Sequence, residues 1–188
     1  MSDSISSNPE IVSCDPVPGY VPWVGHYVAQ LNEVRHDLKA EVEGLGITQL
    51  DWHPDEETES IGTQLLHLDA IEWSWMHEDL QGISEDNYPG SWQEALPIRL
   101  GIPQVKGRAL QWYLGKLDAT RELTLGILEN LTEDDQYRLV GGAELAEGHE
   151  PPNRLFTVDW IIWHVLEHEA AHLGQIELLR RLGPRGEA

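Results

Sequence analysis

Apolar residues recur at intervals of three and four over four long stretches of this chain. In the first stretch they are Val24, Tyr27, Leu31, Val34, Leu38, Val42 and Leu45. The same spacing returns over about 60–80, 104–130 and 157–182. It places apolar side chains on one face of an α-helix, and no segment alternates clearly enough for a strand, although 132–155 has room for a short hairpin. The sequence therefore predicts an all-α fold, a four-helix bundle.

The segments around the predicted helices indicate the topology. Ser60 and Thr157 suit helix N-caps, and Gly183-Pro184 suits the end of the last helix. Residues 82–103 are rich in Pro and Gly and too long for a tight turn, which predicts a long crossover between the second and third helices. Residues 1–20, rich in Ser, Pro and Asp, are expected to form a flexible arm before a bundle domain over 21–184.

The charge of the chain excludes several classes of partner. Asp and Glu number 33 and Lys and Arg 12, so the net charge is −21. That field repels phosphate backbones and anionic lipids, so we expect no nucleic acid and no membrane as partner. Cys14 is the only cysteine, which fits a reducing cytoplasm. We see no signal peptide and no apolar stretch of about 18 residues, and we expect a cytoplasmic protein.

Three histidines follow one another at intervals of four on the predicted fourth helix: His164, His168 and His172. Their side of the helix also carries Ile161, Val165, Gln175, Ile176 and Leu179, so the imidazoles should face the core. A buried imidazole needs partners for both nitrogens, so stacked ones are hard to explain as packing. Neighbours four apart reach one metal ion, whereas His164 and His172 lie about 12 Å apart along the axis. The spacing predicts a metal site on either His164 and His168 or His168 and His172.

A third ligand is expected from another helix of the bundle. His67 is the best candidate because it lies mid-helix, on a mixed side that suits a pocket wall. His77, near the end of the same helix, is expected to be exposed. We assign no role to the other four histidines, which are His26, His36, His53 and His149. Three His ligands would leave at least one position on the ion open, as in catalytic rather than structural sites.

The segment from His168 to His172 also matches the H-E-x-x-H pattern of zinc peptidases, with Glu169 as general base. In those enzymes the third ligand generally follows later in the chain, and no histidine follows His172 here. No sheet is visible upstream to hold a peptide. A hydrolase is therefore the least favoured interpretation, and Glu169 is expected to be solvated or to support a ligand from behind.

The chain resembles the DinB-like family of metal-binding four-helix proteins over roughly residues 22–182. The resemblance rests on WIIWHVLEHEAAHLGQ at 160–175, on LLHLDAIE at 65–72, and on LDWHP at 50–54 followed by ESIG at 59–62. It implies a bundle with a long second connection. It also implies a metal site made of His67, His168 and His172, which resolves the choice of pair. Leu173 stands where relatives often carry a smaller residue and Arg181 where an acidic residue is common, so the resemblance does not define pocket shape or substrate.

The resemblance also implies a function, since characterised relatives include S-transferases and isomerases that use mycothiol, bacillithiol or glutathione. We expect a metal-dependent S-transferase that adds a low-molecular-weight thiol to an electrophilic small molecule held among the Trp side chains. Catalytic residues stay unassigned because no general base can be named. The alternative is a non-catalytic, stress-related protein whose ion supports the fold. Imidazole suits Zn, Ni, Cu or Fe, and we expect Zn or Ni. Eight Trp residues also make a homodimer an expectation.

Overall fold

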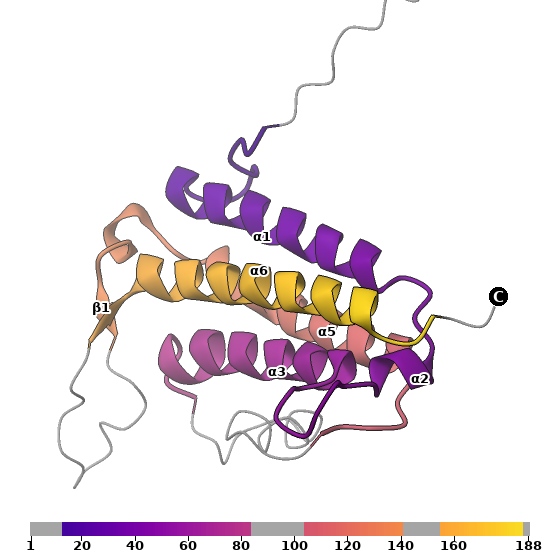
Figure 1. Cartoon of the computed structure of the whole chain (residues 1–188). Helices are drawn as coiled ribbons and strands as arrows, with labels where there is room; N and C mark the ends of the chain where they lie inside the picture. The colour runs from indigo at the N-terminus through magenta and orange to yellow at the C-terminus, as the bar shows by residue number, and fades with distance from the viewer. Residues whose placement is uncertain (1–12, 84–103, 141–154, 186–188) are drawn as a thin grey trace, which may run out of the picture.

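Four long helices lie side by side in the computed structural model, which describes residues 13–83, 104–140 and 155–185 (Figure 1). They are α1 (Pro22–Val42), α3 (Ile61–Trp73), α5 (Leu110–Leu128) and α6 (Val158–Leu182). Helix α6 packs against both α1 and α3, and α3 also packs against α5. The all-α bundle predicted from the apolar periodicity is confirmed.

Shorter elements complete the described part of the chain. They are α2 (Ile47–Leu50), the π-helix η1 (Ser74–Asp79), the 3-10 helix η3 (Glu133–Asp135), and the strands β1 (Leu139–Val140) and β2 (Phe156–Thr157). The strands pair antiparallel, with Leu139 opposite Thr157 and Val140 opposite Phe156. Only β1 falls within 132–155, where the sequence left room for a short hairpin, and the segment 141–154 lies outside the described residues, so that hairpin stays a prediction. No described helix has the length and apolarity needed to cross a membrane.

Two predicted helix ends agree with the structure, and a glycine follows the end of a third helix. The hydroxyl oxygen of Ser60 accepts a hydrogen bond from the backbone N–H of Thr63 at 3.2 Å and so caps α3. Gly44 follows α1 at a φ of +76°, a backbone conformation that side chains with a Cβ rarely adopt. Gly183 is the C-cap of α6. Local turn chemistry therefore fixes these boundaries as the sequence indicated.

One predicted boundary needs correction, and one predicted cap lacks its side-chain bond to the backbone. The third long helix begins at Leu110 rather than near 104, because the hydroxyl of Thr63 donates to Gln104 and accepts from the backbone N–H of Val105. Those bonds hold the preceding segment against the start of α3 instead of letting it wind into helix. Thr157 occupies the N-cap of α6, but its hydroxyl donates to the carboxylate of Asp159 rather than accepting a backbone bond.

Two clusters of buried apolar side chains fill the bundle. Helices α1, α5 and α6 contribute to both, whereas α3 contributes to the first and η1, which continues α3, to the second. The first includes Leu38, Leu65, Leu117 and Ile176. The second includes Leu31, Met76, Leu128 and Val165. Because the two sets occupy opposite ends of α1, of α5, of α6 and of α3 with η1, a layer lies between them in which other side chains meet.

The predicted arm and the predicted crossover are described only in part. Residues 1–12 and 84–103 lie outside the described residues. The backbone N–H of Val17 donates to the carbonyl of Gly25 at 3.2 Å, and Tyr20 packs on the second apolar cluster. The division of the chain at residue 20 stays a prediction.

Candidate metal centre

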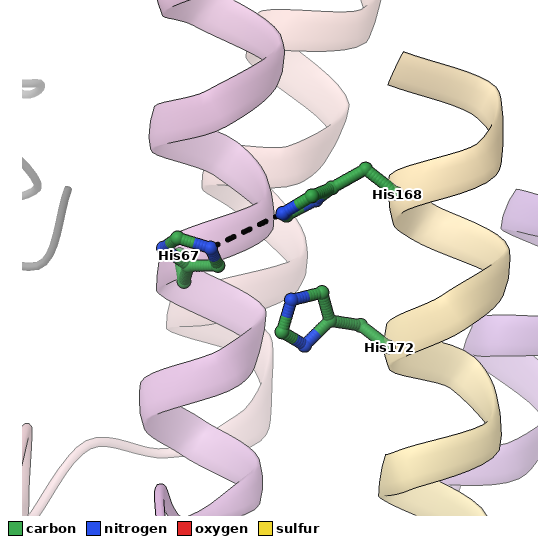
Figure 2. A group of neighbouring side chains, drawn as sticks. All are labelled: His67, His168 and His172. Atoms are coloured by element: carbon green, nitrogen blue, oxygen red, sulfur yellow. Dashed lines mark hydrogen bonds between the residues drawn. The ribbon is translucent and has the colours of Figure 1, made fainter. Parts of the chain in front are cut away.

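The structure brings His67, His168 and His172 together between α3 and α6. One ring nitrogen from each lies within 4.8 Å of the others. The ring centroids are 5.0 Å apart for His67 and His168, 5.1 Å for His67 and His172, and 4.6 Å for His168 and His172. Figure 2 shows the three rings pointing toward one another, His67 from α3 and the other two from successive turns of α6. The three residues named from the sequence thus share one site, and their role as metal ligands stays a prediction.

The spacing of two donor atoms fits a metal ion. Nε2 of His67 and Nε2 of His168 are 3.3 Å apart (Figure 2). Two imidazole nitrogens bound to zinc at about 2.0–2.1 Å in a tetrahedral arrangement lie about 3.3 Å apart. The ring of His172 would need only a small shift to bind the same ion, since its donor atom is already within 4.8 Å of the other two.

His67 itself carries a polar atom that the protein leaves without a partner. Its Nδ1 is buried and has no hydrogen-bond partner among the described residues. If Nε2 donates to His168, a buried lone pair remains at Nδ1, and if Nε2 is the unprotonated nitrogen, a buried N–H remains. Burial of an unpaired polar group costs free energy, which a ligand to the other nitrogen would offset.

Gln64 supports His172 from behind. Nδ1 of His172 lies 3.1 Å from Oε1 of Gln64, a buried side chain one turn before His67 on α3. Since an amide oxygen only accepts, Nδ1 carries the proton and Nε2 is left with its lone pair. Such a bond fixes both the tautomer and the ring orientation that a metal ligand needs.

We expect Gln64→Ala to weaken the affinity for zinc by about 10–100-fold, the usual effect of removing a hydrogen bond behind a His ligand. The affinity is measured by competition with a chromophoric chelator. Gln104→Ala is the matched control, because Gln104 bonds Thr63 at the start of α3 and contacts none of the three rings. Equal affinities for wild type and Gln64→Ala would show that the bond does not orient His172.

All three imidazoles are held neutral at ordinary pH. Burial, followed by the neighbouring rings of His172, His67 and His164, lowers the pKa of His168 to about 3. Burial, followed by His67, lowers the pKa of His172 to about 4. Burial also lowers the pKa of His67, opposed by Glu59. Neutral imidazole is the form that binds metal, so no proton has to leave before an ion enters at neutral pH.

The lowered pKa values predict an acid-sensitive metal-free protein. When the pKa of a His is lower in the folded state than its unfolded value of about 6.5, the unfolded state binds the proton more tightly. The folded state is therefore favoured more above that pH than below it. That contribution is lost as the pH falls from about 6.5 toward the folded values of about 4 for His172 and about 3 for His168. We expect the unfolding free energy of the stripped protein, from urea titrations, to fall between pH 7 and 5. In His168→Ala/His172→Ala the fall should be smaller, and an equal fall would refute this assignment.

His164 lies outside the group. Its ring stacks on Trp160 at 4.9 Å and 11°, and meets Trp75 edge-on at 5.0 Å. Its Nδ1 is 3.5 Å from a carboxylate oxygen of Glu167. The ring centroid is 5.8 Å from that of His168. Of the two pairs that the spacing left open, the structure therefore gathers His168 and His172 around His67.

Two expectations about other residues on these helices were wrong. His77 is buried rather than exposed, because η1 turns it onto Trp73, and the rings stack at 5.3 Å. Gln175 is exposed, so it does not share the core side of α6. His26 and His53 each contact a backbone carbonyl oxygen, of Cys14 and Asp55 respectively. His149 lies outside the described residues.

Of the two roles expected for Glu169, the structure excludes the solvated one. It is 2% exposed, so it is not solvated. Its carboxylate bonds Arg35 of α1 and Arg121 of α5, and both arginines also bond Glu72 of α3. The sequence analysis missed this buried network of two arginines and two glutamates. Because both oxygens of Glu169 are bound by arginine inside the bundle, the carboxylate cannot activate water as a peptidase base would.

Comparison with known families decides the relationship. The family model described as mycothiol-S-transferase matches residues 27–183. The chain belongs to the mycothiol-S-transferase family. This is a DinB-like family, so the resemblance seen in the sequence is confirmed. None of the curated proteins compared with the chain matches it.

Solved structures share the fold of this family member. A conserved protein from Enterococcus faecalis has a TM-score of 0.54 at 15% identity, over 84% of this chain and 94% of that one. A protein from Streptococcus pneumoniae has a TM-score of 0.55 at 13% identity, over 85% and 88%. An uncharacterised protein from Escherichia coli UTI89 has a TM-score of 0.53 at 14% identity, over 88% and 95%. At these identities the likeness concerns the fold alone.

Proposed function

We propose that the protein binds one divalent metal ion, zinc or nickel, through His67, His168 and His172. The observation that carries the proposal is the convergence of three neutral imidazoles from two helices within 4.8 Å. Three protein ligands leave at least one position open, which is typical of catalytic sites. Figure 2 shows the rings meeting from the two facing helices.

We further propose that the protein is an S-transferase whose cosubstrate is a low-molecular-weight thiol, with mycothiol as the first candidate. Membership of the mycothiol-S-transferase family supports this step. In the transfer the thiol loses its proton, sulfur bonds to the electrophilic carbon, and the leaving group departs with the electron pair of the broken bond. A divalent cation at the open position would favour the thiolate, the reactive form of the thiol.

The electrophile is a small molecule that we place beside the aromatic side chains next to His164. Trp75 and Trp160 are half-buried and lie 5.4 Å apart, both against His164. An open hollow of about 330 Å³ at the N-terminal end of α6 is lined by Leu155, Phe156, Thr157 and Trp160. Apolar aromatic walls with few polar groups are typical of small-molecule sites.

A panel of thiols and electrophiles tests this function. The purified protein, stripped and reloaded with zinc or nickel, is mixed with mycothiol, bacillithiol or glutathione and an aryl or alkyl halide, and conjugates are detected by mass spectrometry. We expect metal-dependent conjugation with at least one thiol. A protein that holds its ion but accelerates none of these reactions would instead favour the non-catalytic, stress-related role.

Several further expectations stay predictions. They are that the protein has a small-molecule substrate and no other partner besides the ion and the thiol, that it forms a homodimer, and that it is located in the cytoplasm. Sedimentation over a range of concentrations tests the homodimer directly.

A further inference from the structure

The buried charged network ties all four long helices together. Arg35 of α1 donates to Glu72 at 2.8 Å and to both oxygens of Glu169. Arg121 of α5 donates to Glu72 at 2.7 and 3.1 Å and to Glu169 at 2.6 Å. The four residues are at most 6% exposed. Each carboxylate is therefore held by two guanidinium groups from two different helices.

The arginines also bind the backbone of each other's helix. Nη1 of Arg35 donates to the carbonyl of Leu117 on α5 at 2.8 Å. Nη1 of Arg121 donates to the carbonyl of Leu31 on α1 at 2.9 Å. With these bonds each arginine spans three neighbouring helices. The network thus fixes α6, through Glu169, relative to α1, α3 and α5.

This network lies at the level of the metal centre. Along every long helix, the charged residue falls between members of the two apolar clusters, as Glu169 does between Val165 and Ile176. Glu169 follows His168 directly, and successive residues of a helix point about 100° apart. While the two arginines hold Glu169 in the core, His168 must therefore face α3, where His67 lies.

Resting on the proposed function, we propose that Glu169 is a positioning residue for the metal centre. It acts through Arg35 and Arg121, which set the rotation and the axial position of α6. A helix that slips by one turn moves about 5.4 Å, more than a coordination bond tolerates. The glutamate of the H-E-x-x-H segment thereby serves the metal site without touching the ion or the substrate.

The test measures zinc affinity by competition with a chromophoric chelator, together with the visible spectrum of the cobalt-loaded protein. Glu169→Gln should weaken zinc binding by about 10–100-fold and change the cobalt spectrum. The reason is that the amide NH2 group of glutamine would face a guanidinium N–H, and two donors cannot form a hydrogen bond. Glu169→Met/Arg35→Met removes one charge of each sign and leaves Arg121 paired with Glu72. It should fold about as well as wild type, yet bind zinc at least about 10-fold more weakly. This charge-balanced variant keeps the test open if Glu169→Gln does not fold.

Leu128→Ala is the control for stability alone. Leu128 is fully buried in the second apolar cluster, near the end of α5 and away from the three rings. This variant should be less stable but should bind zinc with wild-type affinity. Wild-type zinc affinity in Glu169→Met/Arg35→Met would overturn the proposal, as would an equal loss of affinity in Leu128→Ala. If the wild-type protein itself binds neither zinc nor nickel, the proposed function fails instead.

Discussion

Replacing Glu72 by alanine is expected to lower the free energy of unfolding by about 3–5 kcal/mol, the usual effect of breaking a buried ion pair on one side. Glu72 is 2% exposed and accepts from both Arg35 and Arg121. Without it two buried guanidinium groups would share the single carboxylate of Glu169. Burial raises the pKa of Glu72, but Arg121 and Arg35 outweigh it and lower the pKa to about 2. Urea titration at pH 7 measures the loss.

A matched pair of variants separates unpaired charge from lost packing. Glu72→Met/Arg121→Met keeps the network neutral and fills its volume with apolar side chains, so it should lose far less stability than Glu72→Ala. A loss below about 1 kcal/mol in Glu72→Ala, the range of an exposed pair, would show that the network does not hold the bundle.

Replacing His168 by alanine is expected to abolish both metal binding and S-transfer. Its ring is one of three nearly equidistant rings, with centroids 5.0 Å from His67 and 4.6 Å from His172. Removing it leaves two ligands on different helices, too few to hold an ion against a competing chelator. Elemental analysis of the purified protein should fall from about one ion per chain to background, and conjugation should fall with it.

His164→Ala is the control for this prediction. The residue type, the helix and the spacing of four are the same, but its ring stacks on Trp160 instead of joining the group. It should keep its metal. If His164→Ala lost the ion while His168→Ala retained it, the pair of ligands on α6 would be wrongly assigned.

Periodicity was sufficient to predict the bundle because α1, α5 and α6 each bury one apolar stripe, although α3 is buried on most sides. It also placed His168 and His172 on the inner side of α6. The choice between this pair and His164 with His168 could not be derived from spacing, because both pairs are four residues apart. Only the position of His67 on a facing helix distinguishes them, and that is a long-range contact.

The buried network was missed for a different physical reason. Arg35 and Glu169 are charged residues inside apolar stripes, and a single charged residue there is easily assigned to a helix edge. The signal was present, since each of the four helices contributes one buried charged residue to the network, two of each sign. Finding it required comparing the four helices together. The burial of His77 could not be foreseen, because it depends on the π-helical turn from Ser74 to Asp79.

X-ray absorption spectroscopy of the zinc-loaded protein, before and after addition of mycothiol, tests most directly whether an ion sits among these rings with a position open to a thiol. We predict three imidazole ligands at about 2.0–2.1 Å and a lighter fourth ligand, which mycothiol replaces with one sulfur at about 2.3 Å. Fewer than three imidazoles, or a first shell that mycothiol leaves unchanged, would contradict this account of the centre.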